Sequence, residues 1–190
     1  MELRVMNADR TNPLEFSGCL HTYFRFEDTS RVELLGFRNA AFIDKADGRQ
    51  QKIQKGPINI ETEAMRTAKS SGAKYGYVHR VYHQNPGTFE FKNLATRKVL
   101  IKVTHSKSWP DTTVYNPWLG DKQGMEKGPD FDDDGYTKTI SLEPTISGDH
   151  AVKLAPGESW VGYQQIEVPL NDDAAKSLHK RSYSTEKSTR

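Results

Sequence analysis

The chain has 190 residues and a formal net charge of +2, from 27 basic and 25 acidic side chains. This length suffices for one domain with a sizeable core. Five of the basic and three of the acidic residues lie in residues 171–190, which leaves 22 of each sign in residues 1–170. A body with balanced charge argues against nucleic acid or a membrane surface as its partner.

The cysteine content and the apolar runs bear on the compartment. The single Cys19 excludes an internal disulfide framework and fits a reducing environment. No apolar run is long enough to cross a bilayer, and the first residues lack the pattern of a secretory leader. We therefore expect a cytoplasmic protein without membrane association.

Residues 171–190 differ in composition from the rest of the chain. They combine Ser, Thr and basic residues without apolar periodicity. Such a segment could contact RNA or a membrane surface, but its composition favours a disordered, solvated tail. We expect the folded domain to span residues 1–170.

Short segments in which apolar and polar residues alternate recur along the chain and predict β-strands. Clusters of Gly, Pro, Asn and Asp separate them, which is typical of antiparallel strands joined by turns. The clearest segments are residues 14–28, 31–37, 87–94, 98–106, 135–143 and 159–170. The longest plausible helix, residues 61–70, has a weak pattern, and we expect residues 64–75 to form a loop insertion. The predicted fold is an all-β antiparallel sandwich.

A histidine and a glutamate on polar strand faces form a candidate acid/base pair. Alternation places His21 on the face opposite Phe24, and Glu143 on the face opposite Leu142. An imidazole and a carboxylate can exchange protons with a small molecule near neutral pH. Taken singly, each residue also fits a structural role, with His21 as a hydrogen-bonded strand residue and Glu143 as a solvated strand end before Pro144.

Two further polar motifs allow a structural reading beside a functional one. Asp44 follows Phe42 and Ile43, where an aspartate ordinarily ends a strand and caps its own backbone. In the YNPW motif at 115–118, Asn116 and Trp118 fit a tight turn that covers a core edge, and they could also line a pocket for a sugar.

His79 and His83 have a four-residue spacing that would make them neighbours on a helix. The surrounding residues predict a strand, in which the two side chains share a face two pleats apart. Two further ligands would be needed for a metal centre. We expect neither a metal nor a cofactor in this protein.

Five motifs occur here in one order. They are LHTYF at 20–24, FID at 42–44, YNPW at 115–118, SLEP at 141–144 and LAPGE at 154–158. In that order they resemble the C-terminal part of the hexose-6-phosphate mutarotases, also called glucose-6-phosphate 1-epimerases, of the aldose 1-epimerase family. The resemblance implies a galactose mutarotase-like sandwich, here N-terminally truncated, that acts on a hexose 6-phosphate as a monomer.

The family also implies roles for three residues. His21 matches the histidine that protonates the ring oxygen, Glu143 the glutamate that takes the C1 hydroxyl proton, and Asp44 an aspartate that binds sugar hydroxyls. The reaction implied is interconversion of the α and β anomers by ring opening and closure. Alternatives are a noncatalytic carbohydrate-binding remnant of the fold and an aldose 1-epimerase that acts on unphosphorylated sugar.

Two departures from the family pattern affect these expectations. The family's phosphate-binding arginines lie in a preceding segment that has no counterpart here, so that no phosphate site is assigned. Arginines that could contact an anion by charge are Arg25, Arg31, Arg38 and Arg80. The family usually has glycine after its glutamate and proline, whereas this chain has Thr145, which could displace Glu143 slightly.

Overall fold

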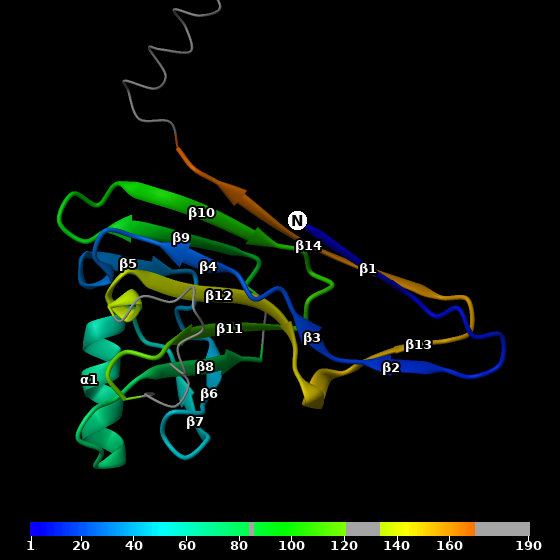
Figure 1. Cartoon of the computed structure of the whole chain (residues 1–190), viewed down its shortest axis with the longest axis horizontal. Helices are drawn as coiled ribbons and strands as arrows, with labels where there is room; N and C mark the ends of the chain where they lie inside the picture. Colours follow the sequence, from blue (N-terminus) through cyan, green and yellow to red (C-terminus); the bar gives the residue numbers. More distant parts are fainter. Residues whose placement is uncertain (84–85, 121–133, 170–190) are drawn as a thin grey trace, which may run out of the picture.

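Two antiparallel β-sheets face each other in the computed structural model, which describes residues 1–83, 86–120 and 134–169 (Figure 1). The smaller sheet has the order β1-β14-β10-β9-β5. Its strands are β1 (Glu2–Met6), β14 (Ser159–Glu167), β10 (Val99–His105), β9 (Thr88–Asn93) and β5 (Val32–Leu35). A separate pair joins β2 (Leu14–Phe16) to β13 (Val152–Leu154).

The larger sheet carries the candidate site. Its order is β3-β12-β11-β8-β6-β7, and β4 also pairs with β12. The strands are β3 (Gly18–Cys19), β12 (Thr139–Ile146), β11 (Asp111–Asn116), β8 (Val78–Tyr82), β6 (Ala41–Asp44), β7 (Gln50–Ile53) and β4 (Tyr23–Arg25). Three 3₁₀ turns accompany them, η1 (Thr29–Arg31), η2 (Gly135–Thr137) and η3 (Gly148–His150).

The core fills the space between the two sheets. One face of the larger sheet contributes Phe42, Tyr82, Val114 and Leu142, and the smaller sheet contributes residues such as Phe91. The predicted alternation is confirmed, because Phe24 and Ile140 pair across β4 and β12 and are both buried. The fold is therefore the predicted antiparallel β-sandwich.

The predicted strand at 14–28 is broken into β2, β3 and β4. Leu20, His21 and Thr22 lie between β3 and β4, where the backbone leaves the ladder. Leu20 N–H still bonds the carbonyl of Pro144, and Leu142 N–H bonds that of Thr22. These bonds hold the segment that carries His21 against β12.

The expected loop at 64–75 is wrong, because a helix, α1 (Ile60–Ser71), occupies most of it. The Asn59 side chain caps the helix by accepting from the Thr62 N–H, and Gly72 ends it in the left-handed conformation. Ile60 and Ala64 are fully buried in the core. Capping and burial together stabilise a helix whose internal pattern is weak.

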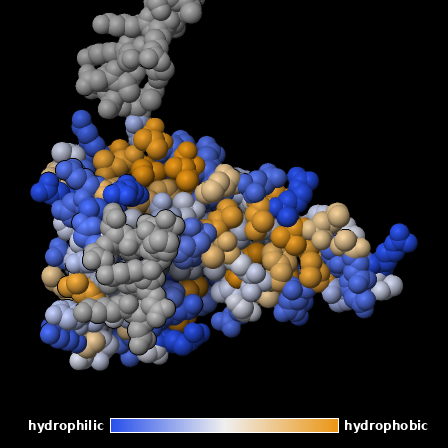
Figure 2. All heavy atoms as spheres, in the orientation of Figure 1, coloured by the Kyte–Doolittle hydropathy of each residue, from blue (hydrophilic) through white to orange (hydrophobic). Residues whose placement is uncertain are grey.

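An arm formed by β1, β2, β13 and the beginning of β14 extends from the sandwich (Figure 1). Hydrophobic side chains gather along this arm (Figure 2). Within it the ring of Trp160 packs edge-on against Phe16 at 5.5 Å and against Trp109 at 4.7 Å. Among the described residues, no helix has the length and apolar character needed to cross a membrane.

Candidate active site

The side chains of His21 and Glu143 lie within hydrogen-bonding distance of each other where the segment between β3 and β4 runs beside β12. Nδ1 of His21 lies 2.9 Å from Oε1 of Glu143. The Glu143 side chain is only 6% exposed, whereas that of His21 is 52% exposed. The fold therefore places a buried carboxylate behind an imidazole that a small molecule can reach.

A neighbouring tyrosine fixes the other side of the His21 ring. The Tyr23 hydroxyl lies 2.9 Å from Nε2 of His21, and the two rings meet edge-to-face with centroids 4.8 Å apart. Burial and the charge of Glu143 raise the pKa of Tyr23, so its hydroxyl stays protonated. Tyr23 therefore holds the imidazole from the side opposite Glu143.

Two more side chains surround the carboxylate. The Ser141 hydroxyl lies 2.7 Å from Oε1 of Glu143, two residues earlier on the same face of β12. Cys19 also faces it from β3, and desolvation together with the charge of Glu143 raises the pKa of the thiol to about 11. Cys19, His21 and Glu143 offer ligand atoms within 4.8 Å of one another, so they could also hold a metal ion.

The register of the sheet shows what else shares this face. Glu143 stands opposite Thr113 on β11, which stands opposite Val81 on β8. Directly paired residues point to the same side of a sheet. In the next row Ser141 pairs with Tyr115 and Tyr115 with His79, whose rings meet edge-on at 5.3 Å. An aromatic and polar surface therefore extends from the acid/base pair across the sheet.

The substitution of Thr145 for the family's glycine is accommodated in the strand. β12 continues past Pro144 to Ile146, and Thr145 pairs with Asp111 on one side and Cys19 on the other. Its hydroxyl donates to Thr113 Oγ1 at 2.9 Å. Glu143 therefore lies within a strand rather than at the predicted strand end.

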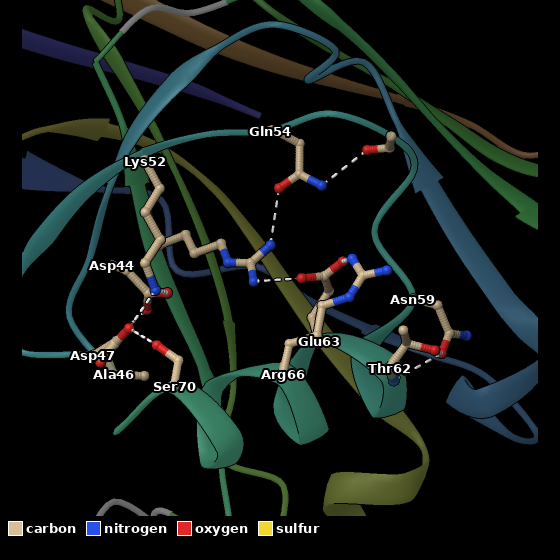
Figure 3. A network of polar contacts seen from close by, with 12 residues as sticks. Asp44, Ala46, Asp47, Lys52, Gln54, Asn59, Thr62, Glu63, Arg66 and Ser70 are labelled. Carbon is tan, nitrogen blue, oxygen red and sulfur yellow. Dashed lines mark hydrogen bonds and ion pairs between the residues drawn. The ribbon is translucent and has the colours of Figure 1, made fainter. Parts of the chain in front are cut away.

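The structure does not bring Asp44 to the pair. Asp44 on β6 pairs with Arg80 on β8. The same cross-strand row continues to Val114 on β11 and Leu142 on β12, which are core residues. This row therefore points to the core side of the sheet, away from Glu143. Asp44 lies in a polar network beside α1, where Oδ2 accepts from Lys52 Nζ at 2.9 Å and Oδ1 from the Ala46 N–H at 3.2 Å (Figure 3).

The same network ties α1 to the sheet (Figure 3). Lys52 also bonds Asp47, and hydrogen bonds from Lys52 and from Ser70 of α1 lower the pKa of Asp47. Deeper in, Arg80 donates to Glu63 Oε2 at 2.6 Å and to Gln54 at 2.8 Å. Arg80 is therefore a buried structural residue and is not placed to bind a sugar phosphate on the opposite face.

Asn116 and Trp118 of the YNPW motif have structural roles in a turn at the edge of the core. Asn116 Nδ2 donates to the carbonyls of Tyr136 and Thr139 at 2.8 and 2.6 Å, and its Oδ1 accepts from the Trp118 N–H at 2.7 Å. Asn116 is almost fully buried, and Trp118 packs on the core. This motif connects β11 to the turn before β12.

A second polar cluster contains His83. His83 lies near Asp111 and His150, not near His79. Asp111 begins β11 and His150 ends η3, so the three residues come from distant parts of the sequence. Local pattern gives no signal for this grouping, because only the pairing of β8 with β11 and the turn after β12 creates it.

Comparison with known proteins identifies the family of this site. The family model for aldose 1-epimerase matches residues 1–167. A protein from Cenchrus ciliaris described as "Putative glucose-6-phosphate 1-epimerase" is 26% identical over 161 residues, which cover 84% of this chain and 43% of that protein. The chain therefore spans less than half the length of this relative.

Solved structures agree on the fold. A "putative mutarotase" from Salmonella typhimurium matches with a TM-score of 0.63 and 18% identity, over 88% of this chain and 50% of its own. The Slr1438 protein of Synechocystis sp. PCC 6803 matches with a TM-score of 0.59 and 15% identity, over 88% and 50% of the two chains. With the family model matching nearly all of the described residues, the chain belongs to the aldose 1-epimerase family.

Proposed function

We propose that this chain carries the acid/base pair of a glucose-6-phosphate 1-epimerase, an isomerase that interconverts the α and β anomers of hexose 6-phosphates. The observation that carries the proposal is the contact between exposed His21 and buried Glu143. Family membership supports the reaction class, and the description of the Cenchrus ciliaris protein supports the phosphorylated substrate.

The chemistry requires two proton transfers at neighbouring atoms of the sugar. Glu143 takes the proton of the C1 hydroxyl while His21, as imidazolium, gives a proton to the ring oxygen. The bond between C1 and the ring oxygen breaks, its electron pair stays on the oxygen, and C1 becomes an aldehyde. Rotation about the C1–C2 bond and the reverse transfers then give either anomer and restore both residues.

The geometry suits this reaction because both oxygens that exchange protons are bonded to C1. One acid and one base a few ångströms apart can therefore serve both atoms. Burial leaves the Glu143 carboxylate with few competing water molecules, and Ser141 and His21 hold its Oε1. Substrate entry must separate His21 from Glu143, which the exposed position of His21 permits.

Aromatic and polar residues beside the pair support sugar binding. Tyr115 and His79 lie on the same face as Glu143, one row away. Aromatic rings pack on the apolar faces of sugars, and polar groups at their edges bind hydroxyls. Asp44 has no part in this proposal as a sugar ligand, because its row points to the core.

Exchange NMR of the glucose 6-phosphate anomers tests the proposal. The purified chain should accelerate exchange over a protein-free blank, and Glu143→Gln and His21→Gln should each lower the enzymatic rate at least a hundredfold. Glu15→Gln, at an exposed residue on the arm, is the matched control and should leave the rate unchanged. A folded chain that exchanges the anomers at the blank rate would refute the enzymatic proposal.

Parallel measurements separate the alternatives. Equal acceleration with unphosphorylated glucose would favour an aldose 1-epimerase without phosphate selectivity. Saturable sugar binding without faster exchange, unaffected by Glu143→Gln, would favour the noncatalytic carbohydrate-binding module. Selective acceleration with the phosphorylated sugar supports the proposal as stated.

A further inference from the structure

Two histidines converge on one buried carboxylate at the end of β11. His150 Nδ1 lies 2.7 Å from Oδ1 of Asp111, and His83 Nδ1 lies 3.4 Å from the same oxygen. The imidazole rings meet edge-on with centroids 5.2 Å apart. The three ligand atoms all lie within 4.8 Å of one another.

These spacings are close to those of ligands that share a metal ion. Zinc binds imidazole nitrogen and carboxylate oxygen at about 2.0–2.2 Å, so neighbouring ligands of a tetrahedral site lie about 3.4 Å apart. The distance from His83 to Asp111, 3.4 Å, matches this value, and the distance from His150 to Asp111, 2.7 Å, is shorter.

The carboxylate is held in place by groups outside the cluster. Asp111 is fully buried, and its second oxygen, Oδ2, accepts hydrogen bonds from both the N–H and the hydroxyl of Ser147. These bonds leave Oδ1 directed at the two histidines. Hydrogen bonds of this kind orient the carboxylate ligands of metal sites.

The cluster also opens to solvent, which a metal ion needs for entry. The side chains of His83 and His150 are 24% and 41% exposed and line an open pocket together with Arg38, Lys107 and Trp109. The cations Arg38 and Lys107 favour an anion or hydroxide as a further ligand of a bound metal. Three protein ligands with a solvent-facing position are typical of zinc sites that keep an open coordination position.

We propose that His83, Asp111 and His150 form a binding site for a divalent transition-metal ion of the zinc, cobalt and nickel class. Two imidazoles and one carboxylate suit these ions, whereas Mg²⁺ and Ca²⁺ prefer oxygen ligands alone. This proposal departs from the expectation of no metal, which considered only His79 and His83. The site does not depend on the proposed epimerase function.

The alternative is a hydrogen-bonded trio in which each imidazole donates a proton to Asp111. Such a trio accounts for the same contacts without a metal, and an ion would have to displace the protons that the imidazoles donate to Asp111. Metal binding by the full chain therefore separates the two readings directly.

The test uses the full chain, dialysed against EDTA and then titrated with ZnCl₂ by calorimetry and with CoCl₂ by visible absorption. We expect one equivalent of Zn²⁺ to bind and MgCl₂ to give no comparable heat. His83→Gln and His150→Gln should each weaken Zn²⁺ binding at least tenfold. Circular dichroism of both variants establishes that they fold.

Two controls locate the ion. His79→Gln, at a histidine of β8 outside the cluster, should leave the affinity unchanged. His21→Gln tests the group of Cys19, His21 and Glu143, and it should also leave the affinity unchanged. Binding lost in His21→Gln but kept in His150→Gln, a thiolate-to-cobalt charge-transfer band, or no stoichiometric binding would each overturn the proposal.

Discussion

Asp44 and Glu143 lie in adjacent rows of one sheet but on its opposite faces. Ile43, the residue before Asp44, belongs to the row of Val81, Thr113 and Glu143. A shift of one residue along a strand reverses the direction of the side chain. The acid/base pair and Asp44 are therefore separated by the sheet itself.

Asp44→Asn should leave anomer exchange within twofold of the parent and reduce stability by about 1–2 kcal/mol, through its bond to Lys52. Exchange NMR and urea unfolding of the same preparation measure the two effects. A hundredfold loss of exchange in a stable Asp44→Asn variant would instead place the carboxylate on the sugar.

Tyr23→Phe should lower the exchange rate about tenfold without unfolding the protein. The tyrosine hydroxyl contacts His21 Nε2 at 2.9 Å, and its loss frees the imidazole to rotate away from the reacting position. The free energy of unfolding should change little, because Tyr23 is 43% exposed and the phenylalanine keeps the aromatic ring. An unchanged rate would mean that Glu143 alone orients the imidazole.

Cys19 should report the charge of Glu143 through its reactivity. With a pKa of about 11, roughly one thiol in a thousand is ionised at pH 8, so alkylation by iodoacetamide should be slow. Glu143→Gln removes the negative charge and should speed alkylation at this pH. Since the chain has a single cysteine, mass spectrometry follows the reaction without ambiguity, and Glu15→Gln should not change it.

Because His105 is buried, the free energy of unfolding should decrease as the pH falls into the mildly acidic range. Burial lowers the pKa of its imidazole from 6.5 to about 3, beside Phe89 and Gln164. Between these two values the unfolded chain binds more protons than the folded one, so stability is lost as the pH falls. His105 contributes a slope of up to about 1.4 kcal/mol per pH unit.

Urea unfolding at pH 7, 6 and 5 checks the contribution of His105. His105→Gln should flatten the dependence on pH in this range, whatever its effect on stability at pH 7. Parallel curves for parent and variant would show that other groups cause the loss.

Glu63→Gln should destabilise the protein by about 3 kcal/mol. It removes the carboxylate that pairs with buried Arg80 at 2.6 Å and leaves a guanidinium charge without its counterion. Glu61→Gln, in the same helical turn, should cost less than about 1 kcal/mol, because only its interaction with the helix dipole is lost. Equal effects in urea unfolding would mean that the Arg80 pair contributes little.

The sequence predicted the layers of this fold because strand alternation is a local property. Phe24, Ile140 and Leu142 are buried, and Glu143 lies on the opposite face of β12 from Leu142, as their spacing indicates. A helix at 61–70 was plausible but weak, and the loop expected at 64–75 was wrong although the caps of the helix, Asn59 and Gly72, are visible in the sequence. The two capping residues indicate the ends of the helix more clearly than the weak apolar periodicity between them indicates its interior.

What the sequence by itself determined is the antiparallel β-rich character of the fold, the alternation of side chains within its clearest strands and the family that its motifs resemble. Only the tertiary structure decided that Asp44 joins a polar network with Lys52 and that Asp111 meets both His83 and His150. The reason is physical. Strand pairing and register depend on contacts between residues far apart in the chain, and a change of one residue in register moves every side chain to the other face.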